Sequence, residues 1–152
     1  MLFDVLKWFH IVLAITAVGA TATYAVWIQR GTIDKGALPF SLRGVQFIDS
    51  KIANPSFVLI LLTGIGMVLT ADMALDTPWI LLSIILWFVG LLLGIFGYTP
   101  TLRRQIVEAE KGGPDSEDYK AVAWRGMVLG IVMGVIVLFI IYLMVFKPAL
   151  WG

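Results

Sequence analysis

The stretch WILLSIILWFVGLLLGIFGY, residues 79–98, decides the fold class of this chain. It contains no charged side chain, and about 20 apolar residues are what an α-helix needs to cross a bilayer. Three further apolar runs lie at residues 8–29, 55–71 and 124–146. Lipid offers no hydrogen-bond partners to an exposed backbone, so each run should be helical. The sequence therefore predicts a single all-α integral membrane domain over residues 1–152, a four-helix transmembrane bundle that runs up-down-up-down.

The composition agrees with a membrane protein. Of the 152 residues 60% are hydrophobic and 14% charged, and the mean hydropathy is +0.95, whereas soluble domains contain about 45–50% apolar residues. Cysteine is absent from the sequence, which excludes a disulfide framework, a zinc–thiolate site, an iron–sulfur cluster and thioether-attached haem. We expect the bilayer to be the main partner, and no nucleic acid.

The connections between the runs are expected to contain short helices. Residues 41–52 place Leu42, Val45, Ile48 and Ile52 near one face, which predicts a short amphipathic helix lying at the membrane interface. Asn54 and Pro55 then form a suitable cap and first turn for the second spanning helix. Residues 99–123 are rich in charges and predict solvated extensions of the third and fourth helices.

Basic residues predict the orientation of this multi-pass protein. They concentrate in the first and third connections, and the second connection has none. They are Arg30, Lys35, Arg43 and Lys51 in the first, and Arg103, Arg104, Lys111, Lys120 and Arg125 around the third. The positive-inside rule therefore places these two connections in the cytoplasm and both termini outside. We expect the location to be the bacterial inner membrane.

Glycine rows mark close helix contacts. They are Gly90, Gly94 and Gly97 in the third run and Gly126, Gly130 and Gly134 in the fourth. Small residues at four-residue steps let helices approach closely in lipid. We expect these helices to pack on each other, on another copy of the chain, or on a larger membrane complex.

His10 is the only histidine, and an ionisable side chain inside a spanning helix is a functional candidate by default. Helical spacing puts it on one face with Ala14, Ala17, Thr21 and Tyr24. This flat stripe favours either a close neighbouring helix or a planar group such as haem. Hydrogen bonding of His10 to a neighbour or to water is the structural alternative.

Methionines at a similar depth widen the possible chemistry. Met67, Met73 and Met144 all fall near the outer side in the predicted topology. A histidine with a methionine can form a haem axial pair. The same pair suits cuprous copper. Methionine is also a common filler of apolar cores.

Several motifs together resemble a known family. They are Lys7-Trp8-Phe9-His10, Asn54-Pro55 followed by Leu62-Thr63-Gly64, Leu102-Arg103-Arg104-Gln105, and Tyr142-Leu143-Met144-Val145-Phe146-Lys147-Pro148. The chain resembles, over nearly its whole length, an uncharacterised family of four-helix bacterial predicted integral membrane proteins. It is more distantly similar to the haem-dependent type of protoporphyrinogen oxidase and to the copper-resistance D membrane proteins. That wider similarity implies that His10 is a haem ligand and that Lys7 pairs with a haem propionate or porphyrin carboxylate.

Three functions follow as hypotheses. The first is a b-type haem protein in which His10 is the axial ligand, with Lys7, Met67 and Met144 at the cofactor, serving electron transfer or porphyrin redox chemistry. The second is a non-catalytic accessory subunit of a larger membrane complex, docked through its glycine-rich helices. The third is a copper-handling protein that uses His10 as a metal ligand.

Overall fold

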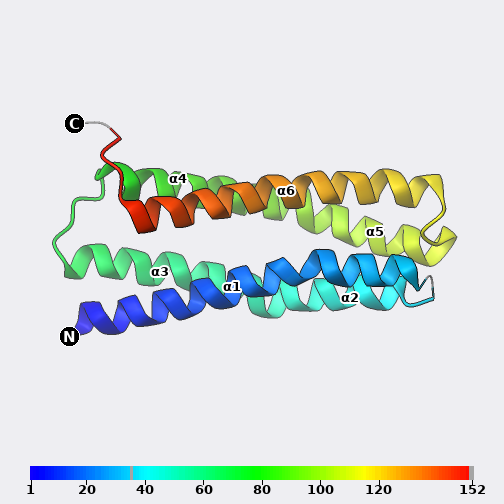
Figure 1. The fold of residues 1–152 in the computed structure, drawn as a ribbon, viewed down its shortest axis with the longest axis horizontal. Helices are drawn as coiled ribbons and strands as arrows, with labels where there is room; N and C mark the ends of the chain where they lie inside the picture. The colour runs from blue at the N-terminus through cyan, green and yellow to red at the C-terminus, as the bar shows by residue number, and fades with distance from the viewer. Residues whose placement is uncertain (35, 151–152) are drawn as a thin grey trace.

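A computed structural model gives the fold and describes residues 1–34 and 36–150 (Figure 1). Within these residues the chain is helical and has no β-strand. The helices are α1 (Leu2–Ile33), α2 (Leu38–Ile48), α3 (Asn54–Thr70), α4 (Pro78–Leu93), α5 (Thr99–Gly112) and α6 (Glu117–Phe146). Two π-helical turns, η1 (Asp49–Ala53) and η2 (Gly94–Tyr98), join α2 to α3 and α4 to α5. The predicted all-α class is confirmed.

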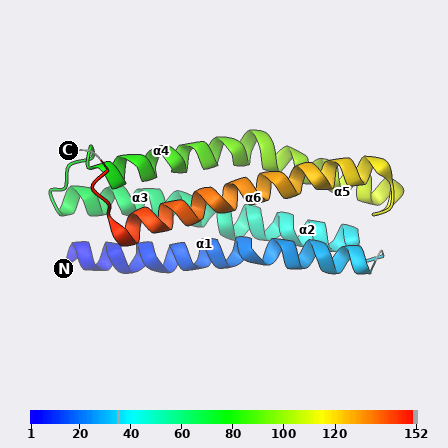
Figure 2. The ribbon, with the colours of Figure 1, turned by 45° about the horizontal axis from the view of Figure 1, so that its top comes forward.

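The elements form four long rods that run alternately up and down. They are Leu2–Ile33, Leu38–Thr70, Pro78–Gly112 and Glu117–Phe146, and each is long and apolar enough to cross a membrane. Rods of 30 to 35 residues measure about 45–53 Å, whereas the hydrocarbon core of a bilayer is about 30 Å thick. The bundle is therefore longer than a membrane is thick. Both ends of the chain lie at the same end of the bundle (Figures 1 and 2).

The rods pack as two hairpins. In the half nearer the termini α1 packs against α3 and α4 packs against α6, and the hairpins are held together mainly where α2 meets α5. The core of buried apolar side chains is concentrated in the other half. Its members include Leu38, Leu42, Val45, Leu102, Ile106 and Tyr119. This division fits a bundle that leaves the bilayer, because burying apolar side chains stabilises helix packing in water and not in lipid.

The predicted amphipathic helix at residues 41–52 exists, but it does not form a separate element along the interface. It is α2, and it continues through η1 into α3 (Figure 2). Leu42 and Val45 are fully buried as expected, whereas Ile52 is exposed and Ala53 is buried in its place. The wide π-turn inserts one extra residue into the helical repeat, and this shifts the buried position by one.

Pro55 and Pro100 explain where the π-turns occur. A proline inside a helix lacks the N–H donor and crowds the carbonyl four residues before it. η1 ends at Ala53, two residues before Pro55, and η2 ends at Tyr98, two residues before Pro100. Each π-turn accommodates the proline that follows it, so the helical rod continues past the proline. The expectation that Asn54 caps a new helix is wrong for this reason, since its backbone is helical and its side chain bonds to Asp49.

The glycine rows contribute unequally to packing. A Cβ built at Gly94 or Gly97 would lie 3.6 Å from Met133 or 3.2 Å from Leu129, so this row faces α6. The predicted contact between the third and fourth rods is thus confirmed. In α6 itself Gly126 faces Gln105 of α5, whereas a Cβ at Gly130 or Gly134 would meet nothing within 4 Å. Within the chain, the expectation of a close contact at Gly130 and Gly134 is wrong, because α6 turns its bulkier side chains toward α4.

Candidate functional site

His10 lies at the contact between α1 and α3. Its Nδ1 atom is 3.0 Å from Oγ1 of Thr63, and the side chain is half-buried. An imidazole among apolar spanning helices is costly to insert, and hydrogen bonding to a facing helix offsets part of that cost. The contact therefore ties the two helices of the first hairpin together.

The tautomer of His10 is linked to the direction in which Thr63 donates its single proton. Oγ1 of Thr63 lies 2.8 Å from the carbonyl oxygen of Leu59 and 3.1 Å from that of Ile60, one turn back in α3. A hydroxyl has one proton, and a carbonyl can only accept. When that proton is donated to a carbonyl of α3, Oγ1 accepts from Nδ1–H of His10. The neutral imidazole then has its lone pair on Nε2, which is the form that binds a metal.

Gly64 supplies the space that the imidazole occupies. A Cβ built at Gly64 would lie 3.2 Å from Cε1 of His10 and 3.6 Å from Nδ1. Two residues further along α3, a Cβ at Gly66 would lie 3.2 Å from Leu6. Glycines of α3 thus let α1 approach closely along this edge.

The flat stripe predicted on α1 is real, and a helix covers it. Ala17 is fully buried and Tyr24 nearly so, while His10, Ala14 and Thr21 are half-buried. Of the two occupants that the sequence left open, the structure has the neighbouring helix, because α3 with η1 packs against α1. A planar group bound by His10 would have to lie at the open side of the ring, away from Gly64.

The other predicted site residues differ in their relation to His10. Lys7 is exposed, one turn before His10 on α1. Met67 is half-buried and four residues after Thr63, on the same face of α3. Met144 is half-buried near the end of α6, which packs against α4 in the second hairpin. The structure therefore brings Met67 into the same helix pair as His10 and places Met144 in the other.

A second polar group lies at the level of the π-turns. The hydroxyl of Tyr24 donates to Oδ1 of Asp49 at 3.2 Å, and the amide of Asn54 donates to Oδ2 at 3.1 Å. The ring of Tyr98, from η2, stacks on Tyr24 with the centroids 6.3 Å apart. Side chains from both hairpins thus meet where the two rods carry their π-turns, and such turns often mark functional positions.

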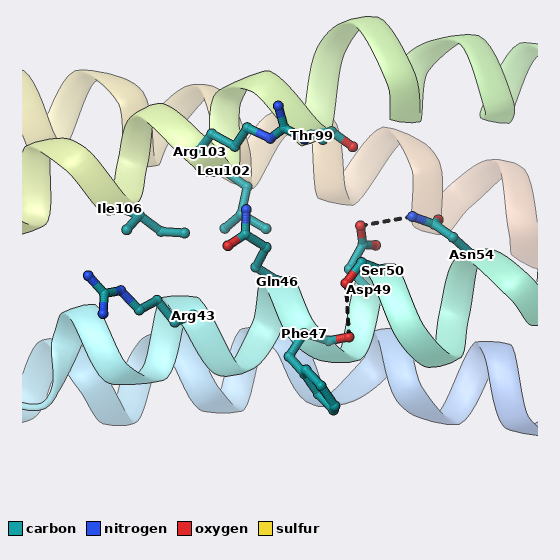
Figure 3. Close-up of a pocket in the computed structure, with 10 residues that line it drawn as sticks. All are labelled: Arg43, Gln46, Phe47, Asp49, Ser50, Asn54, Thr99, Leu102, Arg103 and Ile106. Carbon is teal, nitrogen blue, oxygen red and sulfur yellow. Dashed lines mark hydrogen bonds between the residues drawn. The ribbon is translucent and has the colours of Figure 1, made fainter.

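A cavity of about 640 Å³ opens beside this group, between α2 with η1 and α5 (Figure 3). Its lining residues are Arg43, Gln46, Phe47, Asp49, Ser50, Asn54, Thr99, Leu102, Arg103 and Ile106. Sequence reasoning assigned none of these residues to a site. Pro55 and Pro100, each preceded by a polar residue, were the available signal, and Asn54-Pro55 was interpreted as a helix start.

Metal chemistry in this chain would depend on few donors. Within residues 1–34 and 36–150 no group of three or more histidine, cysteine, aspartate or glutamate side chains is placed to hold a metal ion. His10 with a sulfur, or His10 alone, therefore remains the donor set to consider.

Comparison with models of protein families matches residues 4–148 to a family described as a predicted integral membrane protein (DUF2269). No match was found among curated proteins or among solved structures. The wider similarity to protoporphyrinogen oxidases and copper-resistance D proteins receives no support from these comparisons.

Proposed function

We propose that this chain, which belongs to the DUF2269 family of predicted integral membrane proteins, binds b-type haem through Nε2 of His10. The task of the bound haem is electron transfer or porphyrin redox chemistry. The observation that carries the proposal is the His10–Thr63 hydrogen bond, because donation of Nδ1–H to Thr63 would leave Nε2 as the ligating nitrogen. The iron would supply the one-electron chemistry.

Other residues of the chain have expected roles at this centre. Lys7, one turn from His10 and exposed, is suited to pair with a propionate. Met67, from the helix that packs against α1, is the first candidate for a further residue that would hold the iron, and Met144 is the alternative from the second hairpin. A methionine ligand would raise the reduction potential relative to a second histidine.

Reconstitution tests this proposal. The purified full-length protein is titrated with haemin, and the Soret absorbance is followed to its end point. We expect one haem per chain, unchanged spectra for M144L, a shifted spectrum for M67L, and weaker binding for K7Q. Absence of a saturable Soret change would contradict haem binding.

The same sample separates the alternatives. Copper bound in proportion to protein, and lost in H10A, would favour a copper-handling protein. A protein without either cofactor that purifies in fixed ratio with a larger membrane complex would favour an accessory subunit. In that case the open glycine face of α6, at Gly130 and Gly134, is the expected docking surface.

We also propose that the protein sits in the bacterial inner membrane with both termini outside. The charged ends of α5 and α6 lie at the end of the bundle opposite the termini (Figure 1). This segregation of Arg and Lys supports a cytoplasmic position for that end of the bundle.

A further inference from the structure

We propose that the cavity between α2 and α5, whose lining includes Arg103 and Arg43, binds a phosphate group at the membrane surface. This inference is independent of any cofactor at His10. It rests on the position of the cavity, on the charges that line it, and on the donors left over after the internal hydrogen bonds are made.

The position of the cavity matches the depth of lipid headgroups. On the third rod, Arg103 and Arg104 are the first charged side chains after the apolar run at residues 79–98. On the second rod, Lys51 is the last charge before the apolar run at residues 55–71. The cavity lies at this boundary, where the apolar part of each rod gives way to the charged part. Basic pockets at such a depth are suited to phosphate headgroups.

The two arginines come from opposite walls of the cavity. Figure 3 shows Arg43, Gln46 and Asp49 on the ribbon of α2 and η1, and Thr99, Leu102 and Arg103 on that of α5. A guanidinium group presents a planar fork of donors that matches a phosphate. The side-chain amide of Gln46 shares the lining, whereas the hydroxyl of Ser50 donates to the carbonyl of Phe47 within its own helix.

The acidic group in the cavity is already engaged. Both oxygens of Asp49 accept internal hydrogen bonds, one from Tyr24 and one from Asn54. Arg43 forms an exposed ion pair with Glu110 of α5, and exposed ion pairs are weak. Within the described residues Arg103 has no ion-pair partner, so the lining has donors to spare for an anion.

Native mass spectrometry of the full-length protein in detergent tests the proposal. The probes are phosphatidylglycerol, phosphatidylcholine and inorganic phosphate. We expect phosphatidylglycerol to be retained over phosphatidylcholine, and R103Q to lower that retention about tenfold. R104Q is the matched control, because it removes the same charge from the neighbouring position outside the cavity, and it should change retention less than about twofold.

The substitution E110Q should change phosphatidylglycerol retention in the direction opposite to R103Q. Removing the carboxylate that competes for Arg43 should raise phosphatidylglycerol retention, which a merely structural role of the ion pair would not do. Displacement of the lipid by inorganic phosphate would identify the phosphate group alone as the ligand, and resistance to displacement would identify an anionic lipid. Equal losses in R103Q and R104Q, or lowered retention in E110Q, would overturn the proposal.

Discussion

Tyr24 and Asp49 are 25 residues apart in sequence, and the hydroxyl of Tyr24 donates to Oδ1 of Asp49 at 3.2 Å. The bond joins the middle of α1 to the π-turn of the second rod. Because Tyr98 of the third rod stacks on Tyr24, this single aromatic ring connects three of the four rods. The junction lies at the depth where the lipid-facing half of the bundle meets the half with a buried core.

This junction predicts a measurable coupling. Asp49→Ala leaves the Tyr24 hydroxyl and the Asn54 amide without their acceptor, and should lower the free energy of unfolding by roughly 1–3 kcal/mol. Tyr24→Phe should cost less in the D49A background than in the wild type, as a double-mutant cycle in detergent unfolding would report. Ser50→Ala is the control, since Ser50 bonds only to the carbonyl of Phe47 on the same helix. Strictly additive losses would contradict the coupling.

Two glycines should respond differently to alanine. Gly64→Ala brings a methyl group to 3.2 Å from Cε1 of His10, so the ring must move and the α1–α3 contact should weaken by about 1 kcal/mol or more. Gly130→Ala meets nothing within 4 Å and should be neutral or stabilising by up to about 1 kcal/mol through helix propensity. Thermal unfolding of both purified variants makes the comparison. A larger loss for G130A would indicate that the exposed glycine face is covered by another molecule.

Replacing Thr63 should weaken haem binding because Thr63 hydrogen-bonds to His10, and not because it bonds within its own helix. Thr63→Val removes the acceptor of Nδ1–H, and loss of such a supporting bond should weaken haem retention roughly 10- to 100-fold. Thr70→Val is matched to it, because Thr70 bonds only to carbonyls of Gly66 and Met67 within α3. Haemin titration of the two variants gives the readout. Equal haem affinity for T63V and wild type would show that Thr63 does not contribute to haem binding.

The orientation can be measured cleanly because the chain contains no cysteine. Single cysteines at Asp4 and Lys111 occupy exposed positions at opposite ends of the bundle. A membrane-impermeant maleimide added to intact cells should label D4C, whereas K111C should react only after permeabilisation. The reverse pattern would invert the assigned topology.

The fold was largely predictable from the sequence. The sequence contains four apolar runs, and a run of this length that crosses lipid has to be helical because its backbone finds no other hydrogen-bond partners there. Four such helices can be arranged in only a few ways. The extension of the third rod was predicted from the charged residues 99–123, whereas the continuity of the second rod was not, because Asn54-Pro55 is also what a helix start looks like.

The candidate site was predictable in part. Uniqueness and helical spacing identified His10 and its stripe, and the structure adds the partner, Thr63, from 53 residues away. Two further features depend on which rods are neighbours. One is the hydrogen bond between Tyr24 and Asp49, and the other is the position of Arg43 across the cavity from Arg103. Periodicity along one helix contains no information about that choice, so these residues were missed.

The most direct test of the account is the visible absorption spectrum of the full-length protein purified from haem-sufficient cells, compared with that of H10A. We predict a Soret band with reducible α and β bands in the wild type. In H10A the bands should be lost while the helical circular dichroism is unchanged, since α1 keeps its length and apolarity. A colourless wild-type protein, or an H10A variant with an unaltered Soret band, would contradict haem ligation by His10.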